Sequence, residues 1–282
     1  MKIKGIFIYY LFIIKNMVLA PELTKDEIKR HCDLIMDFIK FASHSEGEYI
    51  KVLNNEEENR VCSVRYASDS KTVDIEFLDN GQEKGVYKVR YGNQELVAAA
   101  AARDHRVDLS EEYYILNQLY NGVPELFPRP ELCYNPKQRE MLGQLLIMEL
   151  LPHIRLDKFR RQDQTIDRDK NLAYIIGRNI AIVHEKTGRI STDPHDGNIL
   201  AQRTNQGIEI AFCDAIQFKE GSLEEGIRCI LANKGERPEC FRFIHKFRDG
   251  IADGICAVSE TPLTRVQVYP QLEYLREYND IF

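Results

Sequence analysis

The sequence predicts an α+β protein in which an antiparallel sheet is followed by a mostly helical part. Residues 61–91 contain short runs rich in β-branched and aromatic residues, and Val73, Ile75 and Phe77 alternate with acidic residues, as in a strand with one buried face. Residues 171–188 instead have the pattern of a buried helix that ends at a glycine, Gly188. With 44% hydrophobic residues, the 282-residue chain is able to bury the cores of one or two domains.

The net charge of −6 comes from interspersed acidic and basic residues rather than from blocks. A protein that binds DNA, RNA or an anionic membrane through its surface usually carries a basic patch. The charge pattern therefore disfavours nucleic acid and membrane partners.

The seven cysteines are scattered along the chain and never form a Cys-x-x-Cys pair. Disulfide frameworks and zinc sites usually have paired or regularly spaced cysteines. We therefore expect reduced thiols, most of them buried, in a cytoplasmic protein.

Two N-terminal regions precede the predicted lobes, and the second is expected to contain an accessory helix that packs on the first lobe. Residues 1–16 have a basic start and a short apolar run, like the core of a signal peptide, but we favour a mis-called start with translation from Met17. Residues 17–60 form a second region, in which Thr24 and Glu27 make a capping box that predicts an accessory helix to about Ala42.

The predicted first lobe covers residues 61–150 and begins with an antiparallel meander over residues 61–91. The turn that joins its first two strands contains Ser68 and Ser70. This small polar turn could present backbone N–H groups to phosphates, although it contains no glycine.

The alanine run from Ala98 to Ala102 leaves two candidates for a cation that contacts phosphates. Alanine has the highest helix propensity, so we expect a helix over residues 95–103. In that case Lys88 is the strand residue that faces the nucleotide. If the run is a strand instead, Arg103 takes that place.

A second helix is predicted to begin at Asp108 or Ser110, and it carries Glu112 one turn before an apolar pair, where it could reach Lys88. Two strands follow, and the second is an apolar run from Leu145 to Met148 that suggests burial on both faces. Residues 149–152 are then the expected crossing into a second lobe, residues 151–282.

The residues Ser191 to Leu200, STDPHDGNIL, carry the clearest chemical signal. Phosphoryl transfer needs a carboxylate that orients the attacking hydroxyl, oxygen ligands for Mg²⁺ and a cation for the phosphates. Asp193 provides the first, Asn198 and Asp214 provide the second, and Lys88 provides the third. His195 could donate to a phosphate or brace the loop.

These motifs resemble the protein-kinase-like superfamily. DPHDGNIL is similar to the catalytic loops of aminoglycoside and choline phosphotransferases and of the AarF/UbiB family, and the compact end resembles RIO-type kinases. The segments GVPELFPRPELCYN, LLIMELL and IGRNIAIVHEKTG also resemble parts of these proteins, so the likeness covers about residues 61–218.

The resemblance implies a two-lobed fold with an antiparallel N-lobe and a reduced, mostly helical C-lobe. It implies ATP and Mg²⁺ as cofactors and a hydroxyl-bearing acceptor, either a protein or a small molecule. It further implies the following roles: Asp193 as catalytic aspartate, Asn198 and Asp214 as metal ligands, Lys88 and Glu112 as an ion pair, and Met148, Glu149, Leu150 and Leu151 at the adenine.

The sequence departs from the kinase pattern around these residues. The triplet that ends at the catalytic aspartate is Ser-Thr-Asp, and Asp214 is followed by Ala215 and Ile216 instead of Phe-Gly. The alternative function is therefore a pseudokinase, a nucleotide-binding scaffold without turnover. A membrane-associated protein of the AarF/UbiB type ranks last, because its Lys-x-Gly-Gln signature is absent.

Overall fold

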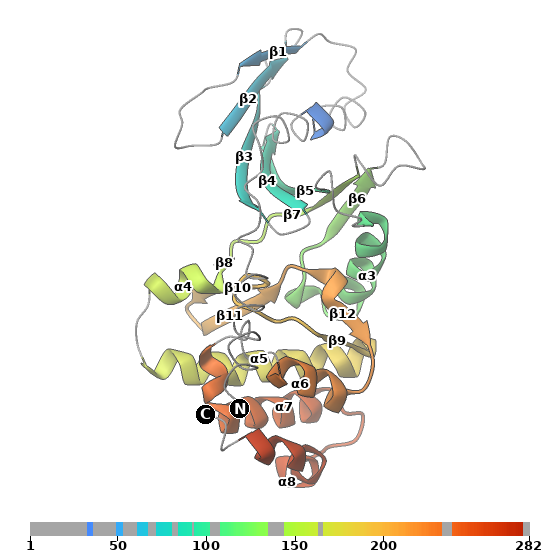
Figure 1. Cartoon of the computed structure of the whole chain (residues 1–282), viewed down its shortest axis with the longest axis vertical. Helices are drawn as coiled ribbons and strands as arrows, with labels where there is room; N and C mark the ends of the chain where they lie inside the picture. Colours follow the sequence, from blue (N-terminus) through green and yellow to red (C-terminus); the bar gives the residue numbers. More distant parts are fainter. Residues whose placement is uncertain are drawn as a thin grey trace, which may run out of the picture. The chain divides into compact units, whose positions relative to one another are not determined.

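The computed structural model of the chain describes residues 33–35, 49–52, 61–66, 72–80, 84–91, 93–101, 108–134, 144–162, 166–232 and 239–278 (Figure 1). The fold is α+β with an antiparallel sheet and several helices, as the sequence predicted. The chain divides into two compact units. Unit 1 comprises residues 1–110 and 131–150, and unit 2 comprises residues 111–130 and 151–282.

A seven-stranded sheet forms most of unit 1, with strand order β1-β2-β3-β4-β5-β7-β6. Antiparallel pairing joins β1 to β2, β2 to β3, β3 to β4, β4 to β5 and β5 to β7. The strands are β1 (Tyr49–Val52), β2 (Val61–Tyr66), β3 (Thr72–Asn80), β4 (Lys84–Tyr91), β5 (Gln94–Ala101), β6 (Pro130–Tyr134) and β7 (Leu145–Glu149). The predicted meander over residues 61–91 is therefore present.

The prediction of a helix over residues 95–103 is wrong, because β5 occupies Gln94–Ala101. Ala98 pairs with Tyr87 of β4 on one side and with Ile147 of β7 on the other. Helix propensity is a weak preference that tertiary context overrides, and here two neighbouring strands hydrogen-bond to the alanine run. Small side chains also suit a central strand whose residues 98–101 are buried.

One face of this sheet carries the core of unit 1. Its buried residues alternate along the strands, as the sequence pattern of β3 predicted. The buried members are Ile35, Val73, Ile75, Tyr87, Val89, Ala98, Ala100, Leu145 and Ile147. Ile35 belongs to the predicted accessory helix, of which the structure describes only residues 33–35, and these are helical.

Unit 2 is mostly helical. Its long helix α5 (Ile166–Thr187) ends at Gly188, whose φ of 68° is the left-handed conformation of a helix C-cap, as predicted. The other helical elements are α3 (Leu109–Gly122, in unit 2 from Glu111), η1 (Pro124–Leu126), α4 (Leu156–Gln162), η2 (Ala215–Gln217), α6 (Leu223–Ala232), η3 (Glu239–Arg242), α7 (Ile244–Val258), α8 (Arg265–Val268) and η4 (Tyr269–Tyr278). No helix among the described residues is long and apolar enough to cross a membrane.

Helices α5 and α7 pack so closely that glycines are required at their crossing. A Cβ atom on Gly250 would lie 2.0 Å from the Tyr174 carbonyl oxygen, and one on Gly254 would lie 2.4 Å from that of Arg178. On the facing helix, a Cβ on Gly177 would lie 2.3 Å from the Phe247 carbonyl oxygen. The two backbones therefore approach at distances that no larger residue allows.

Unit 2 also contains two small sheets. One has the order β11-β10-β8, and the other pairs β12 with β9. Their strands are β8 (Ile154–Arg155), β9 (Arg189–Ser191), β10 (Ile199–Thr204), β11 (Gly207–Phe212) and β12 (Phe218–Glu220). Phe127, Phe212 and Phe218 meet with ring centroids 5.1 to 5.8 Å apart, which fixes β11 and β12 on a buried aromatic cluster.

Candidate functional site

The site residues predicted in unit 2 lie on a loop between β9 and β10 and just beyond the end of β11. The loop begins where β9 pairs with β12, with Ser191 opposite Phe218. The next residue, Thr192, donates from both its backbone N–H and its hydroxyl to the Gln217 carbonyl oxygen, each at 3.0 Å. The start of the loop is thus tied to the segment that follows β11.

Asp193 and Asn198 are joined directly inside this loop. The Asn198 side-chain amide Nδ2 donates to the Asp193 carbonyl oxygen at 3.0 Å, and the Asn198 backbone N–H donates to the His195 carbonyl oxygen at 2.9 Å. The donor end of the Asn198 side chain is therefore used within the loop. Its carbonyl oxygen is the atom suited to a cation.

The hydrogen bonds of His195 determine which ring nitrogen carries its proton. The Gly197 backbone N–H donates to His195 Nδ1 at 2.9 Å, so in the neutral ring the proton is on Nε2. Nε2 lies 3.9 Å from Asp193 Oδ2, which is too long for a direct hydrogen bond. His195 thus braces the loop through Nδ1, which is one of the two roles predicted for it.

Asp214 comes close to Asn198 through the β10–β11 ribbon, as predicted. Ile199 pairs with Phe212, and the Cys213 backbone N–H donates to the Asn198 carbonyl oxygen at 3.2 Å. Asp214 follows and is the residue before η2, with φ −113° and ψ 87°. The register of two adjacent strands therefore sets the separation of Asn198 and Asp214.

Asp193, Asn198 and Asp214 are all partly exposed, so a ligand could reach them. Carboxylate and amide oxygens are hard ligands that suit Mg²⁺, which usually takes one or two protein carboxylates and completes its shell with water and phosphate oxygens. No group of three or more His, Cys, Asp and Glu side chains that could hold a metal occurs among the described residues. Asp193, Asn198 and Asp214 supply two carboxylates and one side-chain amide, which are ligand types that Mg²⁺ accepts.

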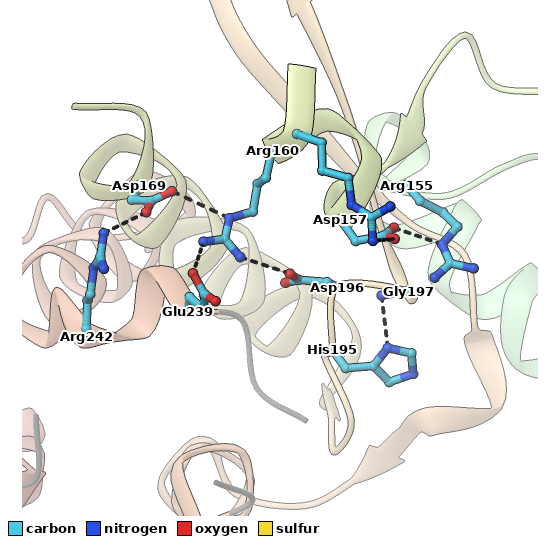
Figure 2. A network of polar contacts seen from close by, with 10 residues as sticks. Arg155, Asp157, Arg160, Asp169, His195, Asp196, Gly197, Glu239 and Arg242 are labelled. Atoms are coloured by element: carbon cyan, nitrogen blue, oxygen red, sulfur yellow. Dashed lines mark hydrogen bonds and ion pairs between the residues drawn. The ribbon is translucent and has the colours of Figure 1, made fainter. Parts of the chain in front are cut away.

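The structure adds a charged network that the sequence did not predict (Figure 2). Arg160 of α4 lies within reach of three carboxylates from separate segments. Its Nη1 donates to Asp196 Oδ2 in the loop at 3.1 Å, its Nη2 donates to Glu239 Oε2 at 2.5 Å, and its Nε lies 3.6 Å from Asp169 Oδ1. Arg242 also binds Asp169, at 2.9 Å.

The network shifts the pKa values of its members in ways that follow from burial and charge. Burial acts to lower the pKa of Arg160, but the three carboxylates outweigh it and raise this pKa. Burial raises the pKa of the Asp196 carboxyl in spite of the opposing effect of Arg160. At Glu239, the hydrogen bond from Arg160 lowers the pKa. The Asp196 carboxylate in the loop is therefore more costly to keep charged than that of Glu239.

A second arginine also borders the loop. Arg155 of β8 donates from Nε to Asp157 Oδ1 at 3.0 Å, and its Nη2 lies 3.6 Å from the place that a Cβ on Gly197 would take (Figure 2). That Cβ would also lie 2.6 Å from the His195 ring. A larger residue at Gly197 would therefore displace the His195 ring from its present position.

Of the residues in unit 1 predicted to bind the phosphates of the nucleotide, the structure describes only Lys88. Lys88, on β4, lies with its Nζ 3.0 Å from Glu95 Oε1, and Arg90 binds the same carboxylate at 2.7 Å. The helix on which the choice of Lys88 rested is a strand. Ser68, Ser70 and the alternative cation Arg103 lie outside the described residues.

The other five predicted residues are divided between the two units. Glu112 of α3 belongs to unit 2 and is 1% exposed, whereas Lys88 belongs to unit 1, so their predicted ion pair stays a prediction. Met148 is buried at the end of β7, and the partly buried Glu149, Leu150 and Leu151 follow it. Unit 1 ends at Leu150 and unit 2 resumes at Leu151.

A cavity of about 420 Å³ lies elsewhere in unit 2. Ten residues line it: His184, Glu185, Leu223, Glu224, Ile255, Ser259, Leu263, Gln271, Leu272 and Tyr274. None of them is a predicted site residue.

No protein-family model matches the chain, and no curated protein matches its sequence. The functional interpretation therefore rests on the geometry of the site itself.

Proposed function

We propose that the protein is an ATP- and Mg²⁺-dependent phosphotransferase with a kinase-like fold, and that it moves the γ-phosphoryl group to a hydroxyl on a protein or a small molecule. The observation that carries the proposal is the hydrogen-bonded loop in which Asn198 binds the Asp193 carbonyl and contacts Cys213. Through these bonds, two carboxylates and an amide oxygen come from one short loop and the adjacent ribbon. Phosphoryl transfer depends chiefly on such positioning and on charge neutralisation.

The proposed roles follow from chemistry and position. Asp193 orients the acceptor hydroxyl and accepts its proton. Asn198 and Asp214 hold the Mg²⁺ that neutralises charge on the phosphates. His195 keeps the loop in shape through Nδ1 and directs its Nε2 proton toward the side where Asp193 lies.

The nucleotide side of the proposal uses residues of both units. Met148, Glu149, Leu150 and Leu151 contact the adenine, and the predicted turn with Ser68 and Ser70, which lies outside the described residues, presents backbone N–H groups to the phosphates. Because residues 94–101 are a strand, we assign the phosphate-binding cation to Arg103, two residues beyond its end, rather than to Lys88. The Lys88 ion pair with Glu95 supports this revision.

The test is Mg²⁺-dependent turnover of γ-labelled ATP by the wild type and by Asp214→Ala. The control is Glu209→Ala, which removes an exposed carboxylate from β11, the strand that precedes Asp214. We expect Asp214→Ala to lower turnover by about a hundredfold or more, whereas Glu209→Ala stays close to the wild type.

The same experiment separates the enzyme from a nucleotide-binding scaffold. The scaffold is favoured by the unusual residues after Asp214 and by a phosphate-covering turn without glycine. It predicts that the wild type binds ATP without turnover. Equal turnover in the wild type and in Asp214→Ala would contradict the proposed roles.

A further inference from the structure

The Arg160 network ties the middle of the candidate loop to three other segments of unit 2 (Figure 2). Asp196 lies between His195 and Gly197, the two residues whose hydrogen bond closes the loop. Its partner Arg160 is on α4, and the other two carboxylates on that guanidinium belong to α5 and η3. The loop therefore has an anchor point that is set by residues outside the loop.

The centre of this anchor, Arg160 with Asp169, is largely buried. The Arg160 side chain is only 14% exposed and that of Asp169 only 6%. A buried charge is costly unless its partners stay in place, so each carboxylate helps to fix the position of the guanidinium. Arg242 completes the set by binding the second oxygen of Asp169.

We infer that Arg160 is a positioning residue, which acts through Asp196 to hold the loop Asp193–Asn198 in the conformation that joins its two ends. Asp196 Oδ2 accepts from Arg160, and Asp196 Oδ1 is buried without a hydrogen-bond partner among the described residues. The carboxylate therefore depends on Arg160. The contact with Arg160 is thus an ion pair that ties Asp196 to a helix outside the loop.

The alternative is that the Arg160 network only stabilises the fold and does not position the loop. Glu239 distinguishes the two roles, because it binds the same guanidinium at 2.5 Å but lies outside the loop and is 73% exposed. If the network is merely structural, removal of either carboxylate has comparable effects on the loop. If Arg160 positions the loop, only the removal of Asp196 loosens it.

The experiment compares Asp196→Ala with Glu239→Ala in the full chain by amide hydrogen exchange. The backbone N–H groups of Gly197 and Asn198 donate to His195 and report directly on loop order. We expect Asp196→Ala to lose protection at these two amides, whereas Glu239→Ala keeps it. Equal protection in the two variants would overturn the inference.

Steady-state kinetics of ATP turnover compares the same two variants, and this second test rests on the proposed function. Displacement of catalytic groups lowers turnover without lowering affinity, so we expect kcat of Asp196→Ala to fall by about a hundredfold with KM for ATP nearly unchanged. Should Asp196→Ala fail to fold, Asp196→Asn removes the charge and keeps the volume, with Glu239→Gln as its control.

The two ideas fail in different ways. If the proposed function is wrong, the wild type shows no turnover, yet the exchange data still decide whether Arg160 holds the loop. If the inference is wrong, the wild type turns over ATP and Asp196→Ala matches Glu239→Ala in both exchange and kcat.

Discussion

At the scale of single residues, the candidate site depends on which atom of each side chain the loop uses for itself. Asn198 uses its Nδ2, and His195 uses its Nδ1 as an acceptor from Gly197. The side-chain oxygen Oδ1 of Asn198 and the Nε2 proton of His195 are then the groups that can interact with a ligand. The sequence identifies these residues, and the hydrogen bonds of the loop show which of their atoms are already used.

A residue-scale prediction concerns Asp253 of α7, which is bound by Arg265 and accepts a hydrogen bond from the Tyr174 hydroxyl at 2.5 Å. The hydrogen bond from Arg265 lowers the Asp253 pKa in the folded protein. The carboxylate therefore stabilises the fold above the usual Asp pKa, and this contribution is lost as the pH falls through the lowered value.

We expect Asp253→Asn to lower the free energy of unfolding near neutral pH by at most about 1 kcal/mol, since the pair is partly exposed. The difference from the wild type should shrink as the pH falls below about 4. Urea unfolding at several pH values measures it, with the exposed Glu260→Gln as control. If the difference in unfolding free energy between the wild type and Asp253→Asn instead increases as the pH falls, the predicted pH dependence is wrong.

At the scale of elements, close helix packing positions the second half of unit 2. Helix α5 precedes β9 and the loop, and α7 packs on α5 through Gly250 and Gly254. Displacement of α7 would therefore also displace α5, the helix that precedes β9 and the candidate loop. The glycines at this crossing serve packing rather than turn formation.

We predict that Gly250→Ala destabilises the protein. Its Cβ would lie 2.0 Å from the Tyr174 carbonyl oxygen, and overpacking of this kind costs about 1 to 3 kcal/mol or more. The gain in helix propensity is only about 1 kcal/mol, so the clash outweighs it. Urea unfolding checks the sign. Gly221→Ala, with no atom within 4 Å of the added Cβ, is the control; a Gly250→Ala protein as stable as that control would refute the prediction.

Element by element, the sequence predicted strands better than it predicted the alanine run. Alternation in Val73, Ile75 and Phe77 predicted β3, because period-two burial is a property of the strand itself. The run from Ala98 to Ala101 has no such pattern, and its strand conformation depends on β4 and β7. Pairing partners distant in the sequence decided that element.

In the candidate site, too, contacts between residues distant in the sequence could not be predicted. The spacing of Asp193 and Asn198 predicted their approach, because five residues in one loop cannot lie far apart. Arg160 is 36 residues from Asp196 and 79 from Glu239, so their contacts depend on how α4, η3 and the loop pack. Charged residues in a segment such as residues 157–170 give no sign of which will pair.

At the scale of the whole molecule, the proposed function draws on both units. Unit 2 carries Asp193, Asn198 and Asp214, whereas Met148, which is proposed to contact the adenine, belongs to unit 1. The proposal therefore requires a nucleotide to interact with residues from each unit. Its central claim is narrower, namely that the loop and the end of β11 hold a divalent ion together with the nucleotide.

Electron paramagnetic resonance of Mn²⁺, titrated in the presence of a non-hydrolysable ATP analogue, tests this claim most directly. It does so whether or not the protein turns ATP over, because it reports binding of the ion itself. We predict that the wild type and Glu209→Ala bind Mn²⁺ with the analogue equally well and that Asp214→Ala binds it at least about tenfold more weakly. Equal Mn²⁺ affinity in the wild type and Asp214→Ala would contradict the account.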